Sequence, residues 1–500
     1  MLRVLDHGPI DHNKDVSSWT GSGTAPQPYK AYNYGFKWGN LYHGNSTGNL
    51  LDYLPDAAVG DTWMMAFDLD AGKIWFGRNG TWGNNGSGTG DPAAGTYPAW
   101  DNINSATGQA GETWCVGGMD YGTGNVSFNF GQQGFVHTRP TGFNDICTAN
   151  MPDTTIKDGT KHFNVVLHTA NATAGKTVTG VGFSPNIFWS ARRNATGASA
   201  GIFDSVRGVG KALNVAYNDP YETEDGVTSF TSPANDDVTL GATWPNARNN
   251  DTWVAWSWKG GTAGSGSTTG SGTGKTYTSN YNAPAGFSIT RYTGNGTAGH
   301  TIPHSLGVTP EMIIIKAEEN SGYWAVYHHK AFESAADPNI LYLNVDAAEA
   351  DDTNVFGTSV TINSSVFSLG DYTGSNTNDE DHIAYCFASV EGYCKVGEYY
   401  GNGNDDGTFV YTGFKPVAVI VKRTDTAEDW WMWDSTRNPG NPIDKNVYIN
   451  SNVAEADEDC SDFLSNGFKL RLNNVNWNAD DGNYIYIAFA ETPFKYANAR

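Results

Sequence analysis

The chain has 500 residues, of which 60 are glycine and 13% are aromatic, and its formal net charge is −23 at pH 7. This balance argues against binding to nucleic acid, because the 30 lysine and arginine residues form no basic stripe. Abundant glycine, aromatic, Asn, Thr and Ser residues predict short strands joined by turns, and the length predicts three to four domains. We expect no membrane insertion and no secretion, because the sequence has no long apolar run and no signal peptide at its start.

The first predicted domain covers residues 1–150. Two strand-like runs, 63–69 and 73–78, flank the turn Asp70-Ala71-Gly72, which has the chemistry of a hairpin. Further on, apolar and polar residues alternate over 126–130, as in a strand with one wet face.

These segments resemble the SPRY domain, a concanavalin-like β-sandwich of two antiparallel sheets. The resemblance extends from Gly60 to Gly131 and departs from the family at its front, where the strands that normally precede Tyr34 are absent or replaced. It therefore implies a sandwich that is incomplete at its N-terminal end. An exposed sheet edge would result, and we expect a neighbouring chain or an altered fold to cover it.

A related block of sequence then occurs three times. Each copy carries a Gly-x-x-Pro tetrad, at 182–185, 307–310 and 413–416. An apolar run follows each tetrad directly, and a second one comes later, at 252–258, 382–387 and 484–489. The copies align Ala255 with Ala384 and Ala488. The repetition predicts tandem antiparallel β-sandwich modules of jelly-roll type at 161–260, 285–391 and 392–500, and it favours display, adhesion or assembly over catalysis.

Segment 261–284 separates the first two modules. It begins with a low-complexity run of Gly, Ser and Thr, a composition that predicts a flexible linker. The first two modules should therefore be separable. No such spacer lies between the second and third modules, which should pack as a rigid pair.

The three copies and the leader are together similar to a family of uncharacterised structural proteins of marine tailed bacteriophages. The most specific similarity lies in 203–208, in 292–296 with 401–403, and in 463–470. The resemblance implies a virion component that assembles in the host cytoplasm, with other virion proteins and further copies of itself as partners.

Tryptophans beside Asn-rich and Gly-rich loops are candidates for sugar binding, because a pyranose stacks on a flat aromatic face while amides bind its hydroxyls. Trp82 and Trp100 lie in turn-rich sequence, with Asn84 and Asn85 between them. These four residues form the candidate glycan platform. The alternative is that the tryptophans fill sandwich cores, which the alternating pattern favours for several of the others.

Motifs of catalysis are missing from the sequence, which has no phosphate loop, nucleophile elbow, zinc-protease helix or dinucleotide turn. We therefore expect no catalytic residues, no cofactor and no metal site. Calcium at acidic turns such as 68–70 and 405–407 stays a weaker alternative, since no spacing matches a calcium loop. The recurring pair of Asp204 with Arg207, and of Asp434 with Arg437, is predicted to brace a turn through an internal ion pair.

The sequence thus predicts a non-enzymatic virion structural protein, either a tail fibre or other appendage or a head-decoration protein. Its loops would attach to host-surface glycan through many weak contacts in an oligomer. Two alternatives stay open: a polysaccharide depolymerase on a concanavalin-like fold, with an acidic pair in a cleft, and a purely architectural scaffold.

Overall fold

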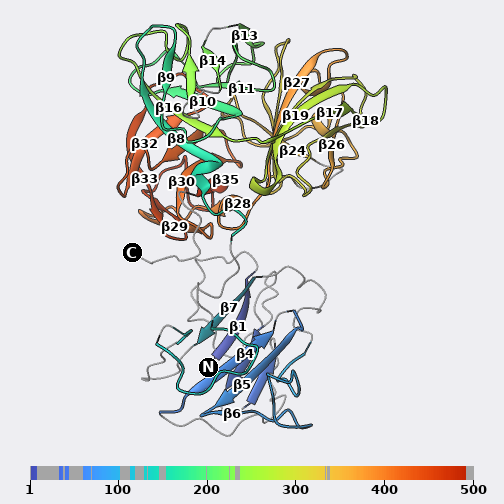
Figure 1. Ribbon diagram of the computed structural model, residues 1–500, viewed down its shortest axis with the longest axis vertical. Coiled ribbons are helices and arrows are strands. Elements are labelled where there is room, and N and C mark those ends of the chain that lie inside the picture. The colour runs from blue at the N-terminus through green and yellow to red at the C-terminus, as the bar shows by residue number, and fades with distance from the viewer. Residues whose placement is uncertain are drawn as a thin grey trace. The chain divides into compact units, whose positions relative to one another are not determined.

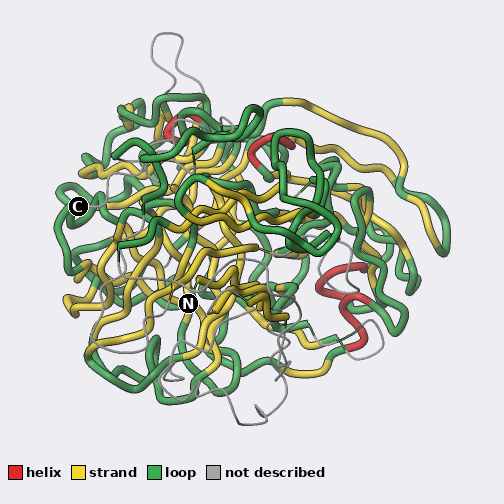
Figure 2. The backbone as a smooth tube through the Cα atoms, turned by 90° about the horizontal axis from the view of Figure 1, so that it is seen from below, coloured by secondary structure: helices red, strands yellow, loops and turns green. Residues whose placement is uncertain are grey.

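The computed structural model describes residues 2–7, 33–37, 40–43, 60–68, 70–101, 113–118, 129–131, 133–145, 154–198, 200–223, 226–230, 237–332, 334 and 338–490, with backbone alone for 2–7, 33–37, 40–43 and 113–118. The chain forms two compact units, Met1–Pro152 and Asp153–Arg500. Strands make up nearly all of the regular structure in the described parts, and helices are single short turns (Figure 2). The protein is all-β and antiparallel, as the sequence predicts.

The first unit contains two described sheets. One has the order β3-β2-β1-β7 and the other β4-β5-β6. Their strands are β1 Leu2–His7, β2 Asn33–Lys37, β3 Asn40–His43, β4 Trp63–Asp68, β5 Lys73–Arg78, β6 Thr81–Trp82 and β7 Thr113–Gly118. The predicted hairpin is present as β4 and β5, and Gly72 supplies the positive φ of 66° that its turn requires. The strand expected at 126–130 lies largely outside the described residues.

A front strand is present in the first unit, where the sequence comparison expects none. β1 pairs with β2 on one side and with β7 on the other, so it lies inside its sheet. The segment is only six residues long and precedes a long Pro- and Gly-rich stretch, which explains why it does not stand out in the sequence. Its partners are distant in the chain, and such pairing is invisible to local pattern.

In the described part of the second unit, strands assemble into three large sheets (Figure 1). The first large sheet has the order β13-β12-β11-β10-β16-β8. Its strands are β8 Phe163–Thr169, β10 Ile187–Arg192, β11 Gly201–Asp204, β12 Lys211–Asn214, β13 Glu222–Thr223 and β16 Thr252–Trp258. A small sheet of β9 Lys176–Val178, β14 Val227–Ser229 and β15 Val238–Leu240 packs on it through a shared core.

The second large sheet has the order β17-β19-β20-β27-β22-β23-β24-β25. Its strands are β17 Thr262–Ser267, β19 Thr276–Asn282, β20 Phe287–Thr293, β22 Met312–Ala317, β23 Ala325–His328, β24 Asn339–Tyr342, β25 Ala350–Asp351 and β27 Asp381–Phe387. Its small partner sheet contains β18 Thr269–Gly270, β21 His300–Pro303 and β26 Val366–Leu369. The short helix α1 Thr353–Phe356 precedes β26 in the sequence, and α2 Thr373–Asn376 follows it.

The third large sheet has the order β28-β35-β30-β31-β32-β33-β34-β29. Its strands are β28 Cys394–Tyr400, β29 Asp406–Tyr411, β30 Pro416–Arg423, β31 Trp430–Asp434, β32 Ile443–Tyr448, β33 Ala456–Leu464, β34 Gly467–Arg471 and β35 Asn483–Ala490. The order β8-β16-β10-β11-β12 of the first sheet recurs as β20-β27-β22-β23-β24 and as β28-β35-β30-β31-β32. The architecture of the second unit is therefore repeat-like.

Segment 261–284 is not the flexible linker that its composition predicts. β17 pairs with β19 over six residues, and β19 continues the second sheet by pairing with β20. The reason lies in 276–282, where Tyr277 and Tyr281 alternate with smaller residues and supply strand propensity. A Cβ on Gly266 would lie 3.0 Å from the Tyr277 ring, so the ring occupies the space that the glycine leaves. Strand pairing thus orders a run that glycine content alone would leave unstructured.

The central strands of each large sheet are buried on both faces. One face packs on its own small sheet or on its own β29, β33 and β34, and the other faces a central core that all three large sheets share. At this core Trp258, Phe387 and Phe489 contact one another, with ring centroids 5.5 to 6.3 Å apart. Burial on both faces explains why the central strands read as continuous apolar runs. The first module is accordingly packed against the other two and is not a separable body.

The pairing register corrects the sequence alignment of the third copy. Ile187, Met312 and Ala418 face Trp258, Phe387 and Phe489 respectively. Ala255 and Ala384 lie three residues before Trp258 and Phe387, and the residue three positions before Phe489 is Tyr486. The sequence comparison selects Ala488 instead. A shift of two residues leaves every side chain on the same face of the sheet, so the hydrophobic pattern cannot detect it.

Candidate functional site

Three seams join the large sheets in cyclic order, and each uses the same two backbone hydrogen bonds. In the first seam, between the first and second sheets, the bonds are Tyr221 N to Glu318 O and Gly322 N to Asn218 O. In the second seam, between the second and third sheets, they are Glu349 N to Thr424 O and Glu428 N to Asp346 O. In the third seam, which returns to the first sheet, they are Glu455 N to Arg193 O and Gly197 N to Asn452 O. All six are 2.8 to 2.9 Å long, and they close the three sheets into a ring.

A buried lysine binds carbonyl groups at the first and second seams. The ammonium group of Lys316 donates to the carbonyl oxygens of Asn218, Ala317 and Asn320 at 2.9 to 3.3 Å. Lys422 donates to Asp346 and Arg423 in the same way. Burial lowers the pKa of each lysine to about 8.

The third seam replaces this lysine. Ala191 of β10 stands at the position that corresponds to Lys316 and Lys422. The neighbouring Arg192 donates from Nε to the carbonyl oxygen of Ala195 at 2.9 Å. The third seam also lacks the tryptophan that the other two seams contain. Trp324 and Trp430 donate across the first and second seams to the carbonyl oxygens of Tyr217 and Tyr342, among others, whereas Ala200 stands at the corresponding place in the third.

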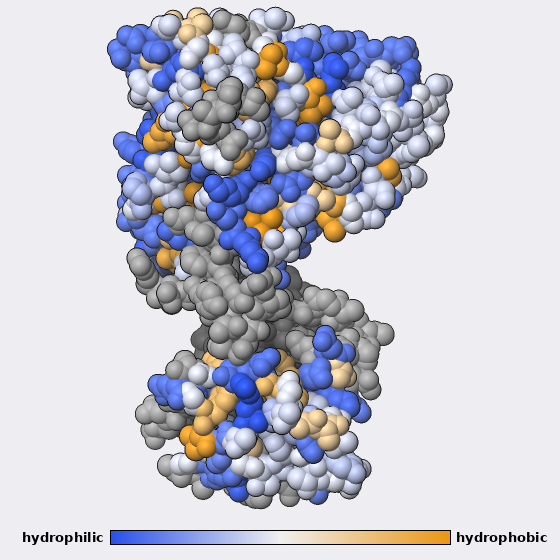
Figure 3. Space-filling model, in the orientation of Figure 1, coloured by the Kyte–Doolittle hydropathy of each residue, from blue (hydrophilic) through white to orange (hydrophobic). Residues whose placement is uncertain are grey.

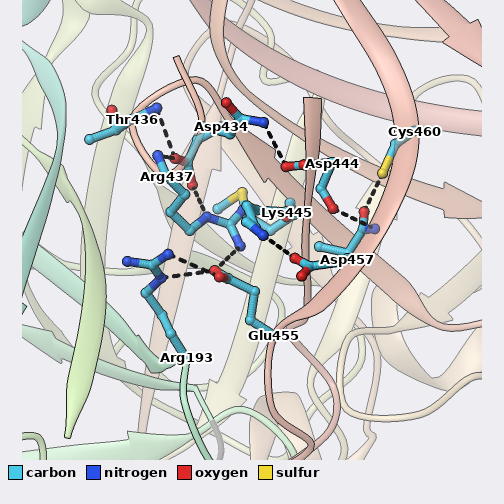
Figure 4. A network of polar contacts seen from close by, with 12 residues as sticks. Arg193, Asp434, Thr436, Arg437, Asp444, Lys445, Glu455, Asp457 and Cys460 are labelled. Atoms are coloured by element: carbon cyan, nitrogen blue, oxygen red, sulfur yellow. Dashed lines mark hydrogen bonds and ion pairs between the residues drawn. The ribbon is translucent and has the colours of Figure 1, made fainter. Parts of the chain in front are cut away.

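Ion pairs hold the third seam (Figure 4). The carboxylate of Glu455 accepts two hydrogen bonds from Arg193, both 2.9 Å long, and one from Arg437 at 3.1 Å. Arg437 also donates from Nε to Asp434 at 2.6 Å, and Trp256 of the first sheet donates to the same carboxylate at 3.1 Å. The hydrogen bonds to Glu455 raise the pKa of Arg193.

The same arrangement appears in the first seam. Arg207 donates from Nε to Asp204 at 2.5 Å, and Tyr385 of the second sheet donates its hydroxyl to that carboxylate at 2.8 Å. Both side chains of each Asp-Arg pair are fully buried. The predicted internal ion pairs therefore exist, and each also receives a donor from the neighbouring sheet. Their charges are satisfied inside the protein, away from solvent.

The four residues of the predicted glycan platform do not share one surface. Trp82 pairs with Gly77 of β5, whereas Trp100 forms a bridge to Ile74. Directly paired residues point to the same face of a sheet, and positions 74 and 77 of β5 point to opposite faces. Trp100 accordingly makes an edge contact with Phe76, on the face of Ile74. The two tryptophans cannot stack on one sugar chain together, and both are half-buried.

The two asparagines shape the loop between these tryptophans. Asn84 accepts a hydrogen bond from Gly86 N at 2.8 Å, and Asn85 accepts one from Ser87 N at 3.0 Å. Asn85 also donates to the carbonyl oxygen of Pro98 at 3.1 Å. Asn84 is exposed and Asn85 half-buried. A role in ligand binding stays a prediction for all four residues.

No group of three or more His, Cys, Asp or Glu side chains gathers as metal ligands within the described residues. His300, one of the histidines in the sequence, is buried and hydrogen-bonded to Asn376 and Thr268. An interior void beside His328, lined also by Met312 and Trp430, is too small to hold a water molecule. Calcium at the acidic turns stays a prediction.

An aromatic surface at the first seam escapes sequence reasoning. Tyr323 is 44% exposed and its ring centroid lies 5.1 Å from that of Tyr342. Tyr342 donates its hydroxyl to Asp352, and the Tyr372 hydroxyl accepts a hydrogen bond from Tyr323 N. We call Tyr323, Tyr342, Tyr372 and Asp352 the tyrosine patch. No local signal could reveal it, because its members come from three loops and from the end of β24.

None of the helices within the described residues has the length and hydropathy to cross a bilayer. No curated protein and no solved structure matches the chain. The family model of a domain of unknown function, DUF7483, matches residues 158–493. This range spans the closed ring and covers more than half of the chain, and the protein therefore belongs to the DUF7483 family.

Proposed function

We propose that the protein is a non-enzymatic virion structural protein of a tailed bacteriophage, in a tail fibre or other appendage or as a head decoration, and that its loops attach to host-surface glycan. The second unit is then three diverged copies of one sandwich, and the first unit a SPRY-like leader. Partners are further copies of the chain and other virion proteins.

The closed ring carries this proposal. Three sheets joined by equivalent backbone bonds, with Trp258, Phe387 and Phe489 in one shared core, are what three fused copies of a self-associating module would form. Such a ring would be a rigid support, and its two Asp-Arg pairs are fully buried beside its seams. A rigid, repetitive support with exposed loops suits display on a particle better than turnover in a cleft.

The surface is consistent with display. Hydrophilic residues cover much of the described surface in view, and hydrophobic residues are scattered among them (Figure 3). The net charge of −23 would keep many displayed copies soluble and apart. Display in several copies also gives weak loop contacts the avidity that adsorption to a cell needs.

Binding and turnover can be measured in one experiment on the full chain. Purified protein is titrated onto immobilised bacterial envelope polysaccharides, and the supernatant is assayed for new reducing ends. The proposal expects saturable binding without release of reducing ends. Release of reducing ends would instead identify a depolymerase, and binding confined to capsid or tail proteins would identify a scaffold. Heat-unfolded protein is the control for nonspecific adsorption.

A further inference from the structure

The tyrosine patch brings polar aromatic side chains from two loops and the end of a strand to one place. Tyr323 lies between β22 and β23, Tyr342 ends β24, Asp352 precedes α1, and Tyr372 precedes α2. The rings of Tyr323 and Tyr342 are tilted by 45°, so they form a shallow angle and not a flat stack. Tyr342 and Tyr372 are half-buried and Tyr323 is exposed. An aromatic face thus meets solvent beside hydroxyl and carboxylate groups.

Hydrogen bonds hold these side chains in place. Tyr342 donates to Asp352 Oδ2 at 2.7 Å, and Asp352 Oδ1 accepts from Asn354 N at 2.9 Å. Tyr372 accepts from Tyr323 N at 3.2 Å. A Cβ on Gly374 would lie 2.3 Å from the Tyr372 ring, so only glycine there seats the ring in this position. Burial, followed by the hydrogen bond to Asp352, raises the pKa of Tyr342 and keeps its hydroxyl protonated.

Two further hydrogen bonds, one of them across the first seam, fix the backbone on both sides of Tyr323. Gly322 N donates to Asn218 O at 2.9 Å, and Trp324 N donates to Asn344 Oδ1 at 3.0 Å. A ring whose backbone is already fixed loses little conformational entropy when a ligand stacks on it. The residue after the equivalent donor is Asp429 in the second seam and Ala198 in the third. The aromatic side chain is therefore particular to the first seam.

We propose that the tyrosine patch binds a neutral hexopyranose unit of a glycan, an inference that rests on the proposed function and gives it a site. The C–H face of the sugar stacks on Tyr323, where a ring contributes apolar contact at low entropy cost. The hydroxyl of Tyr372 accepts from Tyr323 N and still has a proton to donate to the sugar. The Asp352 carboxylate has lone pairs left to accept from sugar hydroxyls.

Charge selects a neutral sugar over a uronate. Asp352 belongs to the patch, and its chain neighbour Asp351 and the neighbour of Tyr372, Asp371, are exposed. The described contacts of the patch include neither lysine nor arginine. A carboxylate on the ligand would therefore meet like charges without a cation to offset them.

Affinity electrophoresis of the full chain tests this inference. The gels contain dextran, mannan, galactan or the polyuronate alginate, and the variants are Tyr323→Ala, Tyr323→Phe and Tyr411→Ala. Tyr411 is 63% exposed at the end of β29, on the third sheet, and is the matched control. Thermal unfolding of each variant shows whether the fold is retained.

We expect at least one neutral polysaccharide to retard the wild type, with a dissociation constant that rises at least about 10-fold in Tyr323→Ala. Tyr323→Phe keeps the stacking face and should stay within about threefold of the wild type, as should Tyr411→Ala. Wild-type affinity in a folded Tyr323→Ala, or a preference for alginate, would overturn the patch and leave the proposed function standing. Retardation by none of the four polysaccharides would count against both.

Discussion

Removing the carboxylate of Glu455 should destabilise the ring at its third seam. The side chain is 9% exposed and accepts three charged hydrogen bonds, two from Arg193 and one from Arg437. Arg193 is 19% exposed, so water can solvate it after the loss. Arg437 is fully buried and keeps its bonds to Asp434 and to the carbonyl oxygen of Met432, but its Nη1 group is left without a partner.

These contacts set the magnitude. An orphaned buried donor costs about 1–3 kcal/mol, and a charged hydrogen bond contributes about 1.5–3 kcal/mol. Because Arg193 recovers much of its loss through hydration, we expect Glu455→Ala to lower the free energy of unfolding by about 3 kcal/mol. This is the lower limit of the range for breaking a buried pair.

Urea unfolding followed by tryptophan fluorescence measures this change. The matched control is Asp457→Ala, because Asp457 lies two residues away and pairs with Lys445 while its side chain is 72% exposed. An exposed pair contributes little, so the control should stay within about 0.5 kcal/mol of the wild type. If Glu455→Ala costs no more than this control, ion pairs do not hold the third seam. A double-mutant cycle with Arg193→Met should show coupling of about 1–2 kcal/mol.

Three further predictions follow from burial and strand pairing. Burial lowers the pKa of His168 to about 4 and of His328 to about 3, so the unfolded chain binds more protons than the folded chain below pH 6.5. Urea titrations at pH 5 should therefore show a free energy of unfolding that is lower than at neutral pH by about 2 kcal/mol per histidine. His168→Phe should remove one such contribution. The lowered pKa of Lys422 acts in the alkaline range, where the folded state releases the proton first. Relative to Lys422→Met, wild-type stability should therefore rise by about 2 kcal/mol between pH 7.5 and 9.5, and an unchanged difference would refute a buried ammonium. Limited proteolysis with subtilisin should leave 262–282 intact, whereas early cleavage there would restore the flexible linker.

Much of the fold could be predicted from local pattern. The apolar runs at 187–192, 312–317 and 416–423 are strands at the centre of their sheets, because burial on both faces imprints a continuous hydrophobic run. The hairpin around 70–72 could be predicted for a different reason, because its turn residues are adjacent in the sequence. Composition predicted a flexible linker at 262–267, but these residues form a strand because they pair with β19. Local pattern also gave no means to see that three sheets share one core.

The sites were harder to predict than the strands. The turns around Asn84 and Asn85 could be predicted from their sequence. The face on which each tryptophan lies depends instead on the strand register. Trp100 forms a bridge to Ile74 and Trp82 pairs with Gly77, so the two rings lie on opposite faces. The tyrosine patch depends on a seam between loops far apart in the chain. The Asp-Arg pairs were predicted correctly because their partners are three residues apart. Contacts between residues close in the chain could thus be predicted from the sequence, whereas contacts between distant residues could not.

The three seams can differ because all three sheets belong to one chain. In an assembly of identical chains every seam has the same residues, so each substitution is repeated at each seam and must be tolerated in all of them. A single chain is free of this constraint. The first seam carries Tyr323 where the others carry Asp429 and Ala198, and the third carries the Glu455 ion pairs where the others have a lysine and an indole. The backbone bonds that close the ring are the same in all three. The shared bonds therefore keep the geometry, and the side chains of each seam are free to specialise, one for closure and another, by our inference, for a ligand.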